Sequence, residues 1–448
     1  MSDAAADSAA MLVQRLADRS ARVGVIGLGY VGLPLAAATA AAGFRTLGFD
    51  IDPQKPTQLN RGLSYIDAVG SETLSRLVAE GRFEATDDFQ RLGECDVVAI
   101  CVPTPLTRQR EPDLSFVEAT VQAIARTLRL GQLIILESTT YPGATREVVK
   151  PLLEASGLTS GADFFLAFSP EREDPGNAEF GTRSIPKVVA GDGPAAARAA
   201  ETFYAAVVER VVPVSSLDAA EAVKITENVF RAVNIALVNE LKMVFERMGV
   251  DVWEVIEAAK TKPFGYMPFY PGPGLGGHCI PIDPFYLTWK SREFDMPTRF
   301  IELAGEINLA MPRYVVGRLE EALDRRLGKS LGSARVLIVG LAYKKNVADV
   351  RESPTFRLLD LLEARGAAVS FHDPHVSEVP PTREHGAYAG RRSIPISPAT
   401  VAEHDAVLVA TDHDVVDYAL ISAQARLIVD TRNVFARLGL AGPNIVKA

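Results

Sequence analysis

A glycine-rich stretch carries the most reactive side chain of the sequence. Residues 271–283 read PGPGLGGHCIPID, so Cys279 follows His278 and lies four residues before Asp283. Glycines allow backbone conformations that are closed to other residues and expose N–H groups to a ligand. In such a donor-rich loop a cysteine can ionise, and its thiolate can act as a nucleophile. From these residues alone, a nucleophilic Cys279 and a structural cysteine in a tight loop are equally good interpretations.

A second set of residues is typical of dinucleotide binding. GLGYVG at 27–32 lies between an apolar run and an Ala-rich segment, and Asp50 ends the next apolar run. In this pattern Gly27 permits the tight turn, Gly29 lets the backbone approach a pyrophosphate, and Gly32 allows close packing of helix on strand. Asp50 would accept hydrogen bonds from ribose hydroxyls and repel a 2′-phosphate, so NAD is predicted rather than NADP. The alternative is a glycine turn that binds no cofactor.

The elements around these residues have the same order at both ends of the chain. Short apolar strands alternate with helices, which is typical of parallel sheets covered on both faces. The predicted strands are Arg22–Ile26, Thr46–Asp50, Asp96–Val102, Leu133–Ser138, Arg335–Val339, Asp405–Ala410 and Arg426–Asp430, with one more ending at Asp373. The fold class is therefore predicted as α/β, with two Rossmann-like domains. The second lacks the full glycine pattern, so it is not predicted to bind a dinucleotide.

Strand patterns are absent between about residues 200 and 325. Ala219–Met248 is predicted as one long helix, and a second helix is predicted around Thr298–Leu309. The apolar face of the long helix holds Ala222, Ile225, Val229, Val233, Ala236, Leu237 and Val244. Lys224 and Asn228 lie one turn apart opposite that face, free to face a cleft. An ordinary solvated helix face is the alternative.

Composition excludes several classes of protein. The chain has 448 residues and a formal charge of −9, without the basic patches of a nucleic-acid-binding protein. Its three cysteines, Cys95, Cys101 and Cys279, make neither a disulfide framework nor a zinc site, and no metal site is predicted. The first two are expected to be buried. The longest apolar stretch, Leu33–Phe44, is too short to span a membrane, and the N-terminus lacks the features of a signal peptide, so a cytoplasmic protein is expected.

Along nearly its whole length the sequence resembles the UDP-glucose/GDP-mannose dehydrogenase family. The matching motifs occur in the family's order: GLGYVG at 27–32, VPTP at 102–105, EST at 137–139, SPER at 169–172, KITEN at 224–228, GGHCIPID at 276–283 and VADVRESP at 347–354. The forms GHCIPIDPFYLTWK and SPEREDPGN look most like the branch that oxidises UDP-N-acetylglucosamine.

The resemblance implies a role for each matching residue. Cys279 would be the nucleophile, and Lys224 and Asn228 would be active-site groups. Thr139, Glu171 and Asp283 would surround a thioester and its attacking water. The implied NAD contacts are Gly27, Gly29, Tyr30, Val31, Gly32, Asp50, Thr104, Thr139 and Arg351, and the implied substrate contacts are Glu171, Arg172, Lys224, Asn228, Gly276 and Lys344. The pair Lys344 and Lys345 suits a nucleotide phosphate, although a solvated turn is an equally good interpretation of it.

The expected activity is a four-electron oxidation of the C6 alcohol of a UDP-N-acetylhexosamine, UDP-N-acetylglucosamine first, to the uronic acid. It would use two NAD and a thioester on Cys279. UDP-N-acetylmannosamine and UDP-glucose are alternative substrates. A β-hydroxyacid-type dehydrogenase that stops after one oxidation and a non-catalytic sensor of NAD or a sugar nucleotide are the competing functions.

The expected organisation has three parts. Residues 1–200 would bind NAD, residues 201–325 would form a helical domain with the cysteine loop and a dimer surface, and residues 326–448 would bind the nucleotide sugar. By the resemblance, homodimers form through the central helices.

Overall fold

The computed structural model describes residues 3–66, 68–107, 109–173, 181–277, 280–382 and 385–448. The chain forms two compact units. The first contains residues 1–227 and 285–296, and the second contains residues 228–284 and 297–448. No helix among the described residues is both long enough and apolar enough to cross a membrane.

The first unit is built on an eight-stranded sheet with the order β3-β2-β1-β4-β5-β6-β7-β8. Its strands are β1 (Arg22–Ile26), β2 (Arg45–Phe49), β3 (Phe83–Thr86), β4 (Val97–Ile100), β5 (Leu133–Leu136), β6 (Phe165–Phe168), β7 (Lys187–Gly191) and β8 (Val211–Pro213). Strands β1 to β6 are parallel and have the Rossmann order, as predicted. β7 pairs with β6 antiparallel, and β8 is parallel to β7. The expectation that no strand lies between about residues 200 and 325 is wrong, because β8 completes this sheet.

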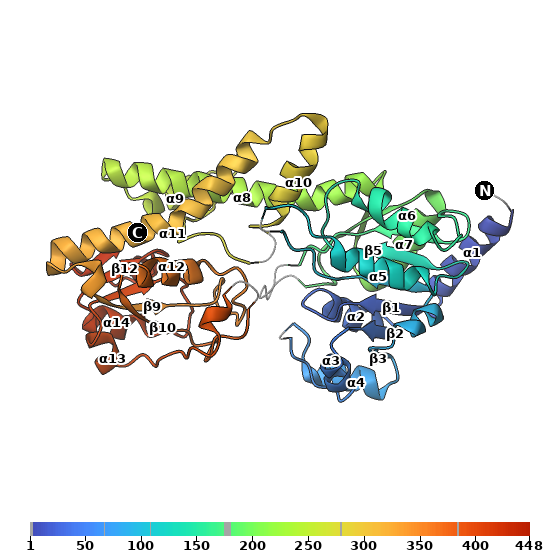
Figure 1. Cartoon of the computed structure of the whole chain (residues 1–448), viewed down its shortest axis with the longest axis horizontal. Helices are drawn as coiled ribbons and strands as arrows, with labels where there is room; N and C mark the ends of the chain where they lie inside the picture. The colour runs from blue at the N-terminus through green and yellow to red at the C-terminus, as the bar shows by residue number, and fades with distance from the viewer. Residues whose placement is uncertain (1–2, 67, 108, 174–180, 278–279, 383–384) are drawn as a thin grey trace. The chain divides into compact units, whose positions relative to one another are not determined.

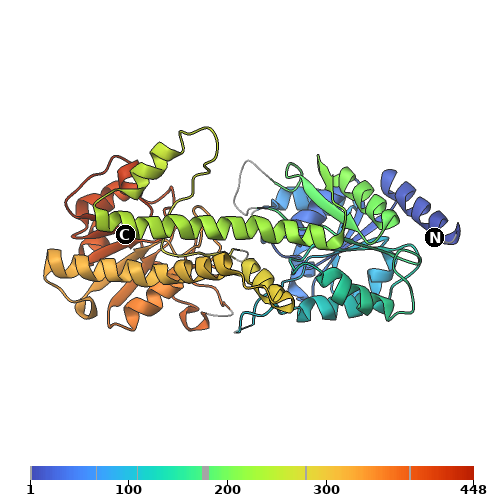
Figure 2. The ribbon, with the colours of Figure 1, turned by 90° about the horizontal axis from the view of Figure 1, so that it is seen from above.

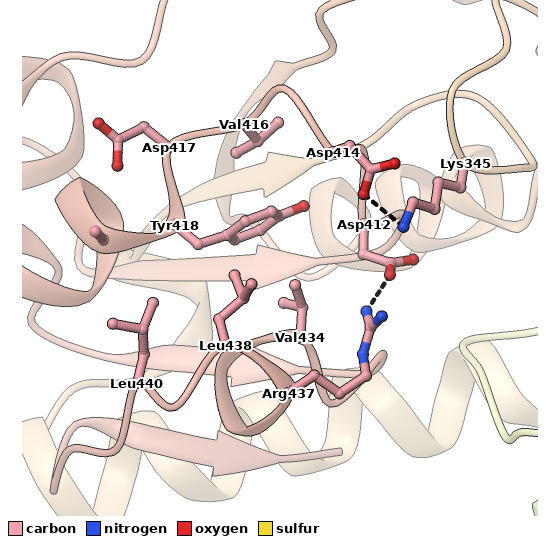
Figure 3. A pocket seen from close by; sticks show the side chains of 11 residues that line it. Lys345, Asp412, Asp414, Val416, Asp417, Tyr418, Val434, Arg437, Leu438 and Leu440 are labelled. Atoms are coloured by element: carbon pink, nitrogen blue, oxygen red, sulfur yellow. Dashed lines mark hydrogen bonds and ion pairs between the residues drawn. The ribbon is translucent and has the colours of Figure 1, made fainter.

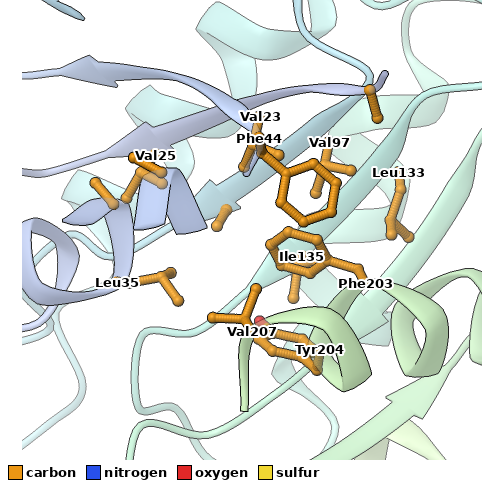
Figure 4. Packing of buried hydrophobic residues seen from close by; sticks show 14 of the residues in the cluster. Val23, Val25, Leu35, Phe44, Val97, Leu133, Ile135, Phe203, Tyr204 and Val207 are labelled. Atoms are coloured by element: carbon orange, nitrogen blue, oxygen red, sulfur yellow. The ribbon is translucent and has the colours of Figure 1, made fainter. Parts of the chain in front are cut away.

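Helices cover both faces of the first sheet. They are α1 (Asp3–Ala17), α2 (Gly32–Ala41), α3 (Gln54–Leu59), α4 (Ser71–Ala79), α5 (Ser115–Ala125), α6 (Lys150–Glu154) and α7 (Pro194–Val207). Figure 4 shows Phe203 and Tyr204 of α7 packed among strand residues such as Val97 and Ile135. Side chains of α5 and α6 pack with the opposite face of the strands. Cys95 and Cys101 are both buried, as expected.

The helical region consists of α8 (Leu217–Met248), α9 (Val252–Ala259), α10 (Asp283–Ser291) and α11 (Arg299–Leu327). α8 begins in the first unit and continues into the second as one helix (Figure 2). Within the second unit α11 lies beside it, where the Asn239 amide donates to Asn308 Oδ1 at 2.9 Å. The predicted end of the second helix at Leu309 is wrong. α11 runs on to Leu327 through Pro312, which is buried inside it.

The predicted apolar face of α8 is buried only in part, because Ile225 and Ala236 are buried whereas Leu237 and Val244 are about half exposed. Phe230, Leu237 and Val244, spaced by seven residues, are 48%, 50% and 47% exposed. The buried positions also include polar residues: Glu221, Lys224, Asn228, Asn239 and Lys242. Lys224 and Asn228 are therefore turned inward, and a line of three apolar side chains on α8, Phe230, Leu237 and Val244, stays about half exposed.

The second unit contains a five-stranded parallel sheet with the order β10-β9-β11-β12-β13. The strands are β9 (Arg335–Val339), β10 (Ala368–His372), β11 (Ala406–Val409), β12 (Ile428–Asp430) and β13 (Ile445–Lys447), and the helices are α12 (Pro354–Glu363), α13 (Pro398–Ala402), α14 (Tyr418–Gln424) and α15 (Val434–Arg437). One face packs against α11 and α12, and the other packs against α13 and α14 (Figure 1). This confirms the second Rossmann-like domain.

Candidate functional site

The turn after β1 has the geometry that a pyrophosphate requires. Gly27 has φ +89°, and a Cβ on Gly32 would lie 1.9 Å from the Gly27 carbonyl oxygen. Only glycine permits this approach of α2 to the strand. A Cβ on Gly29 would meet no atom within 4 Å, so space remains over the backbone there. The start of α2 thus presents its N–H groups beside an open turn, where an anion is stabilised.

Asp50 lies at the carboxyl end of β2 and is buried beside this turn. Its Oδ2 accepts the Leu28 N–H at 3.0 Å and the Lys55 ammonium at 2.8 Å, and its Oδ1 accepts the Asp52 N–H. Each carboxylate oxygen has two lone pairs, so Oδ1 has a position left for a ribose hydroxyl. The residues of this edge therefore fit NAD. Tyr30 in the turn is partly exposed.

Two threonines join the ends of β4 and β5. Thr104 Oγ1 donates to the Thr139 carbonyl oxygen at 2.7 Å, and the Tyr286 hydroxyl of α10 donates to the Thr104 carbonyl oxygen. Parallel strands carry ligands at their carboxyl ends. Both predicted cofactor residues therefore lie at the edge of the sheet where the Rossmann fold binds its ligands.

Glu171 follows β6 at the same edge and is held by three donors. Its Oε1 accepts the N–H groups of Arg172 and Glu173, each at 2.6 Å. Its Oε2 accepts the Lys187 ammonium at 3.0 Å. Lys187 also donates to Glu137 at 2.7 Å. Sequence reasoning missed Glu137 and Lys187, although each is a charged residue at the end of an apolar strand.

These contacts separate the acidities of neighbouring carboxyl groups. Burial alone would raise the pKa of Glu171, but the Lys187 ammonium, the Glu173 N–H and the Lys224 ammonium outweigh it and hold that pKa below its ordinary value. Burial and the charge of Glu171 raise the pKa of Glu173 to about 7. Glu173 therefore has the acidity of a group that can exchange protons near neutral pH.

Arg172 is paired within the first unit. Its guanidinium donates to the Pro186 carbonyl oxygen at 2.6 Å and forms an ion pair with Glu227 of α8. Glu221, also on α8, accepts the N–H groups of Gly143 and Thr145 at 2.6 and 2.8 Å. These bonds hold the start of α8 against the segments that follow β5 and β6.

On α8 itself, Lys224 and Asn228 are 7% and 3% exposed. Asn228 Nδ2 donates to Asp283 Oδ2 at 2.6 Å, within the second unit. Asp283 begins α10 directly after the cysteine loop. The structure thus joins the predicted asparagine to the predicted aspartate four residues after Cys279, while Cys279 and His278 lie outside the described residues.

The rest of the cysteine loop packs against the segment that follows β9. A Cβ on Gly276 would lie 2.7 Å from Tyr343 Cβ, and the Gly277 N–H donates to the Arg351 carbonyl oxygen at 3.3 Å. The Arg351 guanidinium binds Asp349, with a shortest contact of 2.6 Å. Lys344 is half-buried in the same segment. Glycines at 276 and 277 are therefore required by contact with the second sheet's first loop.

A pocket of about 390 Å³ opens beside the carboxyl ends of β11 and β12 (Figure 3). Its floor is apolar, and its rim carries the ion pairs Lys345–Asp414 and Arg437–Asp412. Lys345, one of the two lysines expected to suit a nucleotide phosphate, lines this pocket. Other predicted residues form two sets, one in each unit: Thr104, Thr139 and Glu171 at the first sheet's edge, and Asn228, Asp283, Gly276 and Arg351 around the cysteine loop.

Three sequence profiles match the chain in succession. Residues 21–208 match the NAD binding domain of the UDP-glucose/GDP-mannose dehydrogenase family, residues 218–310 match its central domain, and residues 337–437 match its UDP binding domain.

Whole-length relatives agree with these matches. A UDP-N-acetyl-D-glucosamine 6-dehydrogenase of Pseudomonas aeruginosa is 37% identical, over 88% of this chain and 90% of its own. A UDP-N-acetyl-D-mannosamine dehydrogenase of Pyrococcus horikoshii is 34% identical, over 92% of this chain and 96% of its own. A solved structure of a UDP-D-ManNAc dehydrogenase from Pyrococcus horikoshii aligns with a TM-score of 0.85 at 32% identity, covering 95% of this chain and 98% of that one.

Proposed function

Because the chain belongs to the UDP-glucose/GDP-mannose dehydrogenase family, and is an NAD-dependent UDP-sugar dehydrogenase, we propose that it oxidises the C6 alcohol of UDP-N-acetylglucosamine to the uronic acid. In this proposal residues 1–200 bind NAD, residues 201–325 carry the cysteine loop, and residues 326–448 bind the nucleotide. UDP-N-acetylmannosamine and UDP-glucose are the alternative substrates.

One observation carries the proposal furthest. Asn228 donates to Asp283 at 2.6 Å, and both side chains are buried. Burying an amide or a carboxylate costs free energy unless the group binds a partner or a ligand. The bond ties α8, which also carries Lys224, to the residue that follows the cysteine loop by four positions. The bond supports the proposal that residues of α8 and of the cysteine loop act together in one site and do not form an ordinary solvated helix face.

The chemistry requires four electrons to leave C6. NAD accepts a hydride, and each NAD removes two electrons, so two NAD are used in succession. Loss of a hydride from C6 and of the proton from its hydroxyl leaves an aldehyde. The Cys279 thiolate then attacks that carbon, and the aldehyde oxygen takes up a proton to give a thiohemiacetal. Loss of a second hydride from C6 and of that hydroxyl proton makes a thioester. Water cleaves the thioester to the carboxylate and the free thiolate and releases two protons.

The other residues of the predicted site have roles that fit their chemistry. Lys224 and Asn228 stabilise the oxyanion that develops on the C6 oxygen. Asp283, Thr139 and Glu171 orient the water that hydrolyses the thioester. Arg172, Gly276 and Lys344 bind the sugar nucleotide, and Arg351 approaches the nicotinamide. Thr104, Tyr30 and Val31 complete the NAD contacts.

The covalent step has a direct test. Wild-type protein should form two NADH for each UDP-sugar, whereas a β-hydroxyacid-type dehydrogenase would form one and a sensor none. Cys279→Ala should form no uronic acid, and mass spectrometry of a quenched wild-type reaction should find the sugar acyl group on Cys279. Normal acid formation by Cys279→Ala would rule out the thioester.

The substrate is tested with a panel of nucleotide sugars. NADH formation from UDP-N-acetylglucosamine, UDP-N-acetylmannosamine, UDP-N-acetylgalactosamine and UDP-glucose would be compared as kcat/KM, with products identified by mass. The highest value is expected for UDP-N-acetylglucosamine. A higher value for another sugar would reassign the substrate and leave the reaction type unchanged.

We also propose a homodimer formed through α8. In this dimer, α8 of a second copy covers the exposed apolar line, because apolar residues spaced by seven form the contact between paired helices. Phe230, Leu237 and Val244 have this spacing and about half of each side chain is exposed.

A further inference from the structure

The antiparallel strand of the first sheet brings a lysine to the edge where parallel strands end. β7 runs opposite to β6, so its first residue, Lys187, lies beside the carboxyl end of β6. Ser169 Oγ, just after β6, donates to the Val188 carbonyl oxygen at 2.8 Å and joins the two segments. A parallel strand would bring its last residue to this edge instead. The reversed direction of β7 is therefore what places Lys187 next to Glu171.

Lys187 is shared by two buried carboxyl groups. Its ammonium donates to Glu137 Oε2 at 2.7 Å and to Glu171 Oε2 at 3.0 Å, and its side chain is 5% exposed. Among the described residues, no other lysine or arginine bonds to either carboxyl group. The Tyr204 hydroxyl donates to Glu137 Oε1. One cation thus serves two acids that have little access to water.

The hydrogen bonds of Glu171 leave it one acceptor position. Its two oxygens have about four lone pairs. Two on Oε1 accept the N–H groups of Arg172 and Glu173, and one on Oε2 accepts Lys187. The remaining position on Oε2 is fixed in direction by the three donors. A water or a substrate hydroxyl is the group that such a position accepts.

We propose that Lys187 is a positioning residue that keeps the Glu171 carboxylate anionic and directs its last acceptor position toward the hydrolytic water. This inference rests on the proposed function, because it gives Glu171 its water-orienting part in thioester cleavage. Lys187 does not touch the substrate in this account. It acts through Glu171.

Titratable groups surround Glu171 on every element packed against it. They are Lys187 of β7, Lys224 of α8, Glu137 after β5, Cys101 after β4, Tyr204 of α7 and Glu173 of its own segment. Burial raises the pKa of Glu137, whereas Lys187 holds the pKa of Glu171 low. Of these two carboxyl groups, Glu171 is therefore the more acidic.

The test compares Lys187→Met with Lys187→Arg. Without the cation Glu171 should protonate at higher pH, so the acid limb of the kcat profile should move up by about one pH unit or more. Lys187→Arg should keep the acid limb of the kcat profile near the wild-type pH. The KM for NAD should stay unchanged in both variants. A folded Lys187→Met protein with the wild-type limb would overturn the proposal.

A second variant separates positioning from folding. Lys187→Met leaves two carboxyl groups without a cation, which can destabilise the fold. Lys187→Met combined with Glu137→Gln removes one of these acids and should restore thermal stability while the acid limb stays shifted. Because Glu137→Gln removes a negative charge beside Glu171, the reference is the Glu137→Gln single variant. An acid limb at the same pH in the folded double variant and in Glu137→Gln would show that Lys187 has only a structural role.

The protonation of Glu171 can also be followed without turnover. Infrared titration of glutamate-labelled protein, with Glu171→Gln subtracted, reports its carboxyl band in wild type and in Lys187→Met. The band should appear at higher pH in the variant, and an unchanged titration would contradict the proposal. Absence of NADH with every UDP-sugar would instead refute the proposed function and leave this titration interpretable.

Discussion

Two aspartates occupy equivalent positions in the two sheets but have different hydrogen-bond partners. Asp50 and Asp373 both follow the second strand of a Rossmann-like sheet, and each accepts an N–H from the turn after the first strand, at 3.0 and 2.7 Å. Asp373 also binds the buried His413 imidazole at 3.0 Å and three further N–H groups. Its lone pairs are filled, whereas Asp50 has one left. We therefore expect a ribose hydroxyl to bind at Asp50 and not at Asp373.

Asp50→Ala should therefore weaken NAD binding selectively. Loss of a hydrogen-bonded carboxylate costs about 1.5–3 kcal/mol, so the KM for NAD should rise about 10-fold to 100-fold. Steady-state kinetics at saturating UDP-sugar would measure it. Asp87→Ala, at an exposed position in the same unit, is the control and should leave this KM unchanged. An unchanged KM in Asp50→Ala would remove Asp50 from the NAD site.

At the scale of the element, α8 buries polar residues as well as apolar ones. Its buried face carries amides and charges that bind particular partners, such as Asn239 with Asn308 and Glu221 with the segment after β5. Lys242, on the same face, is buried and has neither a hydrogen bond nor an ion pair among the described residues. Its ammonium lies 5.7 Å from the centroid of the Tyr314 ring. Burial lowers the pKa of Lys242 to about 8.

Lys242→Met should stabilise the protein at neutral pH. The folded pKa of about 8 lies below the unfolded value, so between the two the unfolded chain binds more protons and wild-type stability rises with pH. Below about pH 8 the folded protein bears the full cost of a buried ammonium. Methionine replaces most of the lysine side chain, one heavy atom shorter and without the charge, and the gain at pH 7 should be about 1–3 kcal/mol. Denaturant unfolding would measure the free energy of unfolding at pH 7 and pH 10.

The matched control for this prediction is Lys262→Met, at an exposed position. It should change the free energy of unfolding by less than about 0.5 kcal/mol at either pH. The advantage of Lys242→Met should shrink as pH rises toward 10. An advantage independent of pH would mean that packing, not charge, explains it.

At the scale of the whole molecule, the half-exposed apolar line on α8 is the feature on which the proposed homodimer rests. Phe230, Leu237 and Val244 would expose a row of apolar surface on an isolated chain. Apolar rows of this kind mark surfaces that bind another protein. A second copy supplies the same row in a symmetric contact, which closes the interface without leaving a free surface.

Leu237→Glu should convert the dimer to a monomer. A carboxylate at the centre of the seam would be desolvated against its own copy in the partner, and both charges would repel. Size-exclusion chromatography with light scattering would report the mass. Leu130→Glu, at another exposed leucine in the first unit, is the control and should leave the mass unchanged. A monomeric wild type would refute the dimer proposal.

The amino-acid sequence by itself determined the local features. The glycine turn, the alternation of apolar strands with helices, and the extent of α8 follow from backbone freedom and hydrophobic period, which are properties of neighbouring residues. The pairing of Thr104 with Thr139 could also be anticipated, because parallel strands end at a common edge.

Tertiary structure alone decided the direction of β7, the buried face of α8 and the partners of its polar residues. These depend on contacts between distant parts of the chain. Lys187 meets Glu137 across 50 residues, and Asn228 meets Asp283 across 55. No local period encodes such a pairing, because its stability comes from desolvated charges that find a partner only after the sheet and helices have packed.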